Sequence, residues 1–164
     1  MAITHTFSSY PFEVVVESTE QVTIQHQSDG FKVVFPANMW SADTRIRIDR
    51  ISFCGLMYGR AACGAYAYTI QQLGGNAPGA RSTWTIWVPY SSSMDRAKDY
   101  TTFNAYKDVN GVISDFDPGA WQPAPTRGSA TSNPYAMSGS FSGSYFHNTG
   151  TNYFLVRVDY NCRN

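Results

Sequence analysis

Apolar residues recur with a period of two along most of this chain, and no other sequence feature limits its fold so strongly. The clearest case is the segment 44–49, in which Ile46 and Ile48 alternate with charged residues. Successive side chains of a β-strand point to opposite faces, so strict alternation predicts a strand with one buried and one exposed face. Helix signals are scarce. A serine cap before a short charged run predicts one brief helix at 91–99, and Trp40 is predicted to lie in a single helical turn.

Turn residues divide the alternating pattern into short segments, as expected for an all-β domain. Segments with strand character are 12–17, 22–25, 31–35, 44–49, 51–58, 65–72, 83–88, 112–116, 139–146 and 153–160. The connection at 117–134 is long and contains four prolines, which favours Greek-key crossing between two sheets over an up-and-down barrel. We therefore predict an all-β fold, a single jelly-roll-type antiparallel β-sandwich of eight or nine strands with one or two short helical turns. An immunoglobulin-like sandwich and a closed barrel are the alternatives.

The sequence assigns residues 1–164 to a single domain, of which residues 1–10 are a short N-terminal arm. A chain of 164 residues is long enough to bury a sizeable core. Alternation predicts that this core contains Val14, Val16, Val33, Phe35, Ile46, Ile48, Phe53, Ile70, Ile86, Phe154, Val156 and Val158. If Ile46 and Ile48 are buried, the arginines that flank Ile46 point away from the core.

Charge and aromatic content exclude several classes of protein. Twelve basic residues balance twelve acidic ones, which excludes a polybasic tail for nucleic acid or an anionic membrane. Charged residues make up only 15% of the chain and aromatic residues another 15%, so the chain is not of the disordered type. An aromatic-rich, charge-poor surface aggregates unless it is covered. The composition therefore predicts extensive contacts with further copies of the chain.

The lack of a recognisable secretion signal and the spacing of the cysteines both predict synthesis in a cytoplasm. The first residues carry neither a charged n-region nor an apolar h-region. The longest apolar stretch, 51–67, is interrupted by glycines and Arg60, so no membrane association is expected. Cys54, Cys63 and Cys162 are expected to be reduced thiols, because their spacing is not that of a zinc site.

Two glycine-rich segments look like catalytic motifs but lack the essential residues. The segment 139–143 has Phe141 where a nucleophile elbow has its nucleophile, and 74–79 is followed by no phosphate-binding lysine. Both segments are interpreted as turns. The three histidines lie apart from acids and cysteines at ligand spacing: His5, His26 and His147. We therefore expect no enzymatic activity and no cofactor.

One acidic cluster has the composition of a metal site. Asp108, Asp115 and Asp117 lie close together in sequence, and oxygen-rich loops bind Ca²⁺, which takes roughly six to eight oxygen ligands. These three aspartates are the candidate calcium ligands. Their spacing is not that of an EF-hand, and Asn110 followed by Gly111 is interpreted more simply as a hairpin turn.

Positive charge is concentrated at Arg45, Arg47 and Arg50. Arginine binds phosphate oxygens bidentately, and a row of strand-borne arginines near aromatic side chains is suited to RNA. These three are the candidate nucleic-acid-binding residues. The alternative is that Asp43 and Asp49 neutralise them in ion pairs at a surface or a subunit contact, which the zero net charge favours.

Several short stretches resemble the coat proteins of small satellite RNA viruses, the family of the satellite tobacco mosaic virus coat protein. They are Pro-Phe-Glu-Val at 11–14, Phe-Lys-Val at 31–33, Trp-Ser-Ala-Asp-Thr-Arg at 40–45 and Asn-Cys-Arg at 161–163. The resemblance implies a single-jelly-roll capsid protein, of which sixty copies assemble into an icosahedral virion around RNA. The expected location is the virion, after synthesis in the host cytoplasm. Such proteins usually begin with a basic arm, whereas residues 1–11 contain no Lys or Arg. Any RNA contact would therefore fall to arginines on the inner surface of the shell.

A carbohydrate-binding lectin or module on a β-sandwich is the alternative function. It would use aromatic and amide side chains in loops, here Trp121, Tyr135, Tyr145, Asn148 and Asn152. A small sandwich hydrolase or cupin-like enzyme is a third class, and it would need clustered histidine ligands that the sequence does not show.

Overall fold

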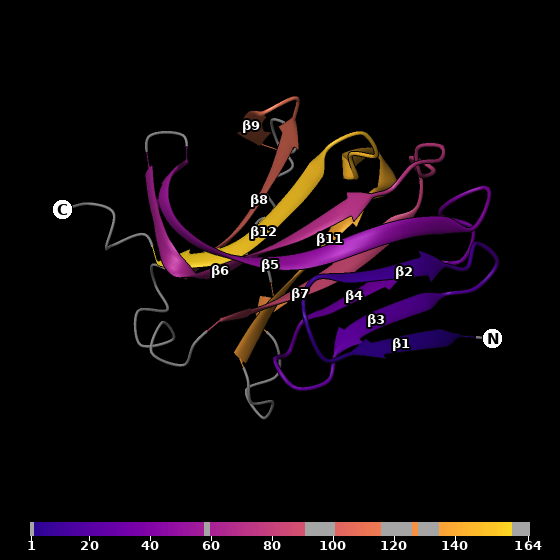
Figure 1. Cartoon of the computed structure of the whole chain (residues 1–164), viewed down its shortest axis with the longest axis horizontal. Coiled ribbons are helices and arrows are strands. Elements are labelled where there is room, and N and C mark those ends of the chain that lie inside the picture. Colours follow the sequence, from indigo (N-terminus) through magenta and orange to yellow (C-terminus); the bar gives the residue numbers. More distant parts are fainter. Residues whose placement is uncertain (1, 58–59, 91–100, 116–125, 128–134, 159–164) are drawn as a thin grey trace.

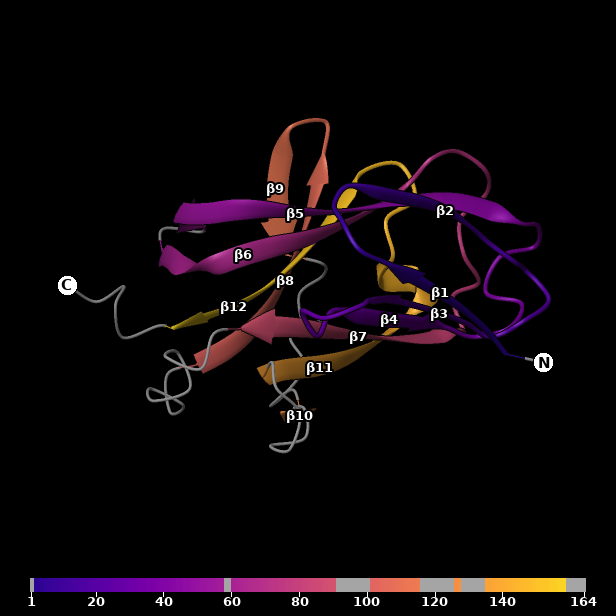
Figure 2. The same ribbon diagram turned by 60° about the horizontal axis from the view of Figure 1, so that its bottom comes forward.

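The computed structural model describes residues 2–57, 60–90, 101–115, 126–127 and 135–158, which form two six-stranded sheets packed face to face (Figures 1 and 2). Sheet I has the strand order β1-β3-β4-β7-β11-β10, and sheet II has the order β2-β5-β6-β12-β8-β9. The strands of sheet I are β1 (Ile3–Phe7), β3 (Val22–His26), β4 (Lys32–Phe35), β7 (Thr83–Tyr90), β10 (Thr126–Arg127) and β11 (Tyr135–Ser142). The strands of sheet II are β2 (Phe12–Val16), β5 (Thr44–Met57), β6 (Arg60–Gln72), β8 (Thr101–Val109), β9 (Val112–Asp115) and β12 (Thr151–Val158).

The strand pairing confirms the predicted all-β sandwich. Its pairs are antiparallel apart from β1, which runs parallel to β3. From β7 onward the chain alternates between the sheets, so that β7 pairs with β11 in sheet I and β8 pairs with β12 in sheet II. Strands distant in sequence therefore lie side by side, which is the winding that closes a two-sheet sandwich.

The described part of the chain contains twelve strands rather than the predicted eight or nine. Strand β1 takes up most of the expected N-terminal arm, and β8 and β10 are also additional; all three carry few aliphatic residues and exist through their pairing with neighbours. The segments 44–49 and 51–58 belong to one strand, β5, whose register shifts between Ser52 and Cys54.

Helical structure in the described residues is limited to one 3-10 turn, η1 (Gly143–Tyr145). Trp40 lies in a bend rather than in the predicted helical turn, because its ring is anchored in the core and its indole nitrogen bonds to Gln72. The predicted helix at 91–99 lies outside the described residues. No helix that the structure describes is long and apolar enough to span a bilayer.

The inner faces of the two sheets form the core, largely as predicted. Buried positions include Val16, Val33, Phe35, Ile46, Ile48, Ile70, Ile86, Phe154 and Val156. Val14 is half-buried, and the side chains of Phe53 and Val158 are not among those described. The ring of Trp84 joins both sheets, with centroid distances of 5.9 Å to Phe35 and 5.5 Å to Phe154.

Two devices hold the loops at the end of the sandwich where β7 begins. The buried amide of Gln72 accepts a hydrogen bond from Trp40 Nε1 (3.0 Å) and donates to the carbonyls of Gly74 and Asn76 (2.8 and 2.7 Å). Gly143 lies so close to the loop before β7 that a Cβ at this position would be 2.0 Å from the carbonyl oxygen of Gly79. The segment 139–143, interpreted from its sequence as a turn, is instead the end of strand β11 followed by the first residue of η1.

Candidate functional site

The predicted arginine cluster is divided between the two faces of sheet II. Arg45 and Arg47 lie on the outward face of β5, because the alternating residues Ile46 and Ile48 are fully buried. Arg50 lies an even number of residues from Ile46 and Ile48, so its side chain is on their side of the strand, opposite Arg45 and Arg47 and at the edge of the core. The structure therefore brings Arg45 and Arg47 together and separates Arg50 from them.

Arg45 and Arg47 share one carboxylate, that of Glu13 on β2. The Nη1 atoms of Arg45 and Arg47 lie 3.8 Å from Glu13 Oε1 and Oε2 respectively. All three side chains stay largely in solvent, with exposed fractions of 61% for Arg45, 41% for Arg47 and 45% for Glu13. Ion pairs this exposed contribute at most about 1 kcal/mol each. The trio is therefore a surface patch with one positive charge in excess.

The sequence predicted Asp43 and Asp49 as the acidic partners of these arginines. In the structure their acidic partner is Glu13. The carboxylate of Asp43 accepts a hydrogen bond from the backbone N–H of Ser18 (2.9 Å), and that of Asp49 accepts one from the backbone N–H of Arg50 (2.8 Å). Antiparallel pairing of β2 with β5 places Glu13 opposite Arg47. Spacing along the sequence cannot reveal such a cross-strand neighbour.

Arg50 belongs to a compact group of aromatic and charged residues, which we call the Asp29 cluster: Tyr10, Asp29, Arg50, Tyr66 and Tyr68. The Arg50 guanidinium lies 4.9 Å from the ring centroid of Tyr10 and 4.4 Å from that of Tyr66, and its Nη1 is 3.7 Å from Asp29 Oδ2. Tyr10 donates a short hydrogen bond to the same Asp29 oxygen (2.6 Å). The positive charge of Arg50 is thus stabilised by cation–π contacts with two tyrosine rings and by the carboxylate of Asp29.

Burial in the Asp29 cluster changes the ionisation of two tyrosines. Loss of solvent, followed by the hydrogen bond and the charge of Asp29, raises the pKa of Tyr10 far above its usual value of about 10. Burial, followed by the charge of Asp29, also raises the pKa of Tyr68 well above that value. Both phenols therefore stay neutral to a higher pH than a solvent-exposed tyrosine, and the cluster acts as a structural joint between β2, β5 and the loop before β4.

His26 stabilises the loop that carries Asp29. Its Nδ1 accepts hydrogen bonds from the backbone N–H groups of Ser28 and Asp29 (3.1 and 3.0 Å), and its Nε2 donates to the carbonyl of Ser8 (3.2 Å). His5, in turn, contacts the Glu17 carboxylate at 2.8 Å and ties β1 to the end of β2. These two histidines therefore connect segments of the fold.

The structure tests only part of the candidate calcium site. Asp108 lies in β8, and the hairpin to β9 closes through Asn110 and Gly111, whose φ values of 56° and 82° are those of a type I′ turn. This confirms the interpretation of that dipeptide as a turn. The side chain of Asp115 and the whole of Asp117 lie outside the described residues. Among the groups that are described, no three potential metal ligands come together.

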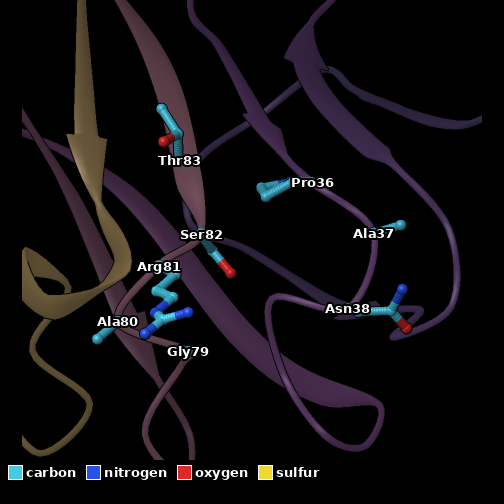
Figure 3. Close-up of a pocket in the computed structure, with 8 residues that line it drawn as sticks. All are labelled: Pro36, Ala37, Asn38, Gly79, Ala80, Arg81, Ser82 and Thr83. Atoms are coloured by element: carbon cyan, nitrogen blue, oxygen red, sulfur yellow. The ribbon is translucent and has the colours of Figure 1, made fainter.

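A shallow pocket of about 620 Å³ lies beside the start of β7, at a place that the sequence analysis did not single out (Figure 3). One wall is the loop after β4, with Pro36 and Asn38, and the other is the segment with Arg81 and Ser82. Figure 3 shows Arg81 and Asn38 on opposite sides of the hollow. It is suited to a small polar group, with Arg81 as its only charged lining residue.

Three of the five loop residues proposed for sugar binding have described side chains, and one of these, Asn152, has a structural role. Asn152 is completely buried, and its side chain serves the backbone: Nδ2 donates to the carbonyls of Ile70 and His147, and Oδ1 accepts from the N–H of His147. The expectation that Asn152 is a binding residue is therefore wrong. Tyr145 packs against the core, and Asn148 is half-buried. Trp121 and the side chain of Tyr135 lie outside the description.

Comparison with known proteins adds no assignment to these surfaces. No protein-family model matches the chain, and no curated protein is significantly similar to it.

Proposed function

We propose that this protein is a capsid protein that self-assembles into a small icosahedral shell. The observation that carries the proposal is the ribbon formed by the far halves of β5 and β6. Their pairing continues to Met57 and Arg60. Among the residues that the structure describes, β2 pairs with β5 along 44–48 and β12 pairs with β6 along 67–71, so the rest of the ribbon has no described neighbouring strand. Figure 1 shows this end of the hairpin curving away from the sandwich.

The ribbon has the properties of an interface element. Its paired segments 54–57 and 60–63 contain a single charged residue, Arg60, and otherwise only apolar, cysteine or glycine residues. A two-stranded ribbon is marginally stable in water, and open strand edges bind other strands. A neighbouring subunit would cover both edges, which agrees with the low charge content of the chain.

The proposal assigns RNA contact to Arg45 and Arg47 on the surface of the shell that faces the lumen. Their guanidinium groups are exposed, and Glu13 neutralises only one of the two charges. Arg50 is left out of this role because Asp29 and two tyrosine rings engage it. With so few cations, the shell would hold RNA weakly and in a salt-dependent way.

Particle size tests the proposal. Sixty copies of an 18.2 kDa chain form a particle of about 1.1 MDa, which size-exclusion chromatography and negative-stain microscopy would detect. We expect Leu56→Asp, in the ribbon, to give a folded monomer with an unchanged circular dichroism spectrum. Ser41→Asp, at an exposed loop position, is the matched control and should still form particles. A wild-type protein that stays monomeric at high concentration would refute the proposal, and particles of normal size from Leu56→Asp would remove its main support.

A further inference from the structure

The outward face of sheet I carries mainly hydroxyl and amide side chains across five neighbouring strands, β1, β3, β4, β7 and β11. Figure 2 shows these strands lying together in one sheet. In β3, β4, β7 and β11 the residues that alternate with them are buried in the core. Strand register places ten residues in two rows, which we call the hydroxyl face: Thr6, Gln25, Lys32, Trp87 and Ser138 in one, and Thr4, Thr23, Val34, Thr85 and Ser140 in the other. All ten are exposed or half-buried.

The hydroxyl face combines an aromatic platform with ordered hydroxyl groups. Lys32 Nζ lies over the half-buried Trp87 ring, 4.1 Å from its centroid and near the middle of the first row, so a sugar that packs on this face of the ring would displace the lysine side chain. In the second row, Thr85 Oγ1 and Ser140 Oγ are hydrogen-bonded at 2.8 Å. Threonine is β-branched and stiff at χ1, and the hydrogen bond to Thr85 orients the hydroxyl of Ser140, so both hydroxyls are ordered without a ligand.

The charge of this face selects the kind of ligand. None of the ten residues is acidic, and Lys32 is the single cation among them. An RNA strand binds mainly through phosphates that basic side chains neutralise, and each neutralised phosphate adds about 0.7 to the slope of log affinity against log salt concentration. One lysine therefore gives little affinity for RNA. A sugar needs none: its hydroxyls donate and accept hydrogen bonds, and the C–H face of its ring packs on an aromatic ring. An uncharged polyhydroxyl ligand is thus the better match.

We propose that the hydroxyl face is a binding site for a neutral glycan. The Trp87 ring supplies the platform, Thr85 on the same strand supplies a hydrogen-bonding group, and Gln25 and Thr23 supply further ones from β3. Strands about 4.8 Å apart make the face long enough for several sugar units of an extended chain. This site lies on a sheet rather than in the loops, and it is a property beyond self-assembly.

Isothermal titration calorimetry with neutral tetrasaccharides of glucose, mannose and N-acetylglucosamine tests the inference. We expect binding of at least one of them that does not change between about 50 and about 500 mM salt. Trp87→Ala should weaken it about tenfold or more, and Gln25→Ala about threefold. Gln71→Ala is the matched control, because Gln71 is an exposed amide on the outward face of sheet II, opposite Arg47. It should leave the affinity unchanged.

Three outcomes would overturn the proposal. The first is no binding of any of these sugars at millimolar concentration, and the second is wild-type affinity in both Trp87→Ala and Gln25→Ala. The third is salt-dependent binding of a uridine oligoribonucleotide that Lys32→Ala abolishes, which would make the face a polyanion site. Gln25→Ala keeps the test valid if Trp87→Ala does not fold. Particle size, measured on the same variants, separates this inference from the proposed assembly: loss of sugar binding with normal particles supports it, and loss of particles would make the face a subunit contact instead.

Discussion

Tyr10 and Tyr68 couple the Asp29 cluster to pH. The pKa of each phenol is raised in the folded protein by burial and by Asp29, so the folded state favours the neutral form. In the unfolded chain both ionise near pH 10. The contribution of these two tyrosines to the free energy of unfolding should therefore be constant below about pH 10 and should fall as pH rises above it, by up to about 1.4 kcal/mol per pH unit for each tyrosine. Urea unfolding between about pH 8 and 11.5 measures this decline, which should flatten in the Tyr10→Phe, Tyr68→Phe double variant. An equally steep decline in that variant would contradict the assignment.

Gly143 shows how one missing side chain permits a close approach of two loops. Its N–H donates to the carbonyl of Ser82 at 2.7 Å, and a Cβ there would overlap the backbone of Gly79. Backbone cannot move aside as a flexible side chain does, so Gly143→Ala should cost about 1–3 kcal/mol of unfolding free energy. The control is Gly79→Ala, whose Cβ would meet its nearest atoms at 3.4 and 3.6 Å. Denaturation midpoints compare the two, and equal losses would rule out the steric explanation.

At the scale of the element, β5 carries different chemistry on its two faces. The outward face holds Arg45 and Arg47 beside Glu13, and the inward face holds the isoleucines of the core. If this strand contacts RNA, the Arg45→Ala, Arg47→Ala double variant should lower the ratio of absorbance at 260 to 280 nm in purified particles and reduce their salt sensitivity. Glu13→Gln should act in the opposite direction, because it frees one positive charge. An unchanged ratio would contradict RNA contact, and failure to assemble at every salt concentration would identify a subunit contact.

At the scale of the whole molecule, the two outward faces of the sandwich differ in the number of charged side chains that they present. Sheet I presents the hydroxyl face, and sheet II presents the patch of Arg45, Arg47 and Glu13. Because the inner faces of the two sheets pack against each other, their outer faces point in opposite directions (Figure 2). A shell with sheet II toward its RNA would therefore have sheet I on its outer surface. Intact particles should then bind the neutral tetrasaccharide with the same stoichiometry per subunit as the Leu56→Asp monomer. Binding that begins only after particles dissociate would show the reverse orientation.

The fold class could be predicted from the sequence because its determinants are local. Alternation at Ile46 and Ile48 specifies a strand and its buried face within a few residues. Asn110 and Gly111 likewise specify a turn, since both accept positive φ. Strand β1 has no such local signal: it is formed by pairing with β3, so its formation depends on the rest of the sheet.

The candidate sites depended on which strands lie side by side, and only the tertiary structure decided that. Register placed Glu13 beside Arg47, Trp87 beside Lys32, and Cys54 opposite Cys63. Arg50 was separated from Arg45 by parity, which the sequence does show, but its partner Asp29 comes from a distant loop. Each strand's own alternation determined which side chains point outward. The neighbours of each outward side chain depend on the register between strands. That register is set by burying the inner faces of both sheets in one core, which involves the whole chain.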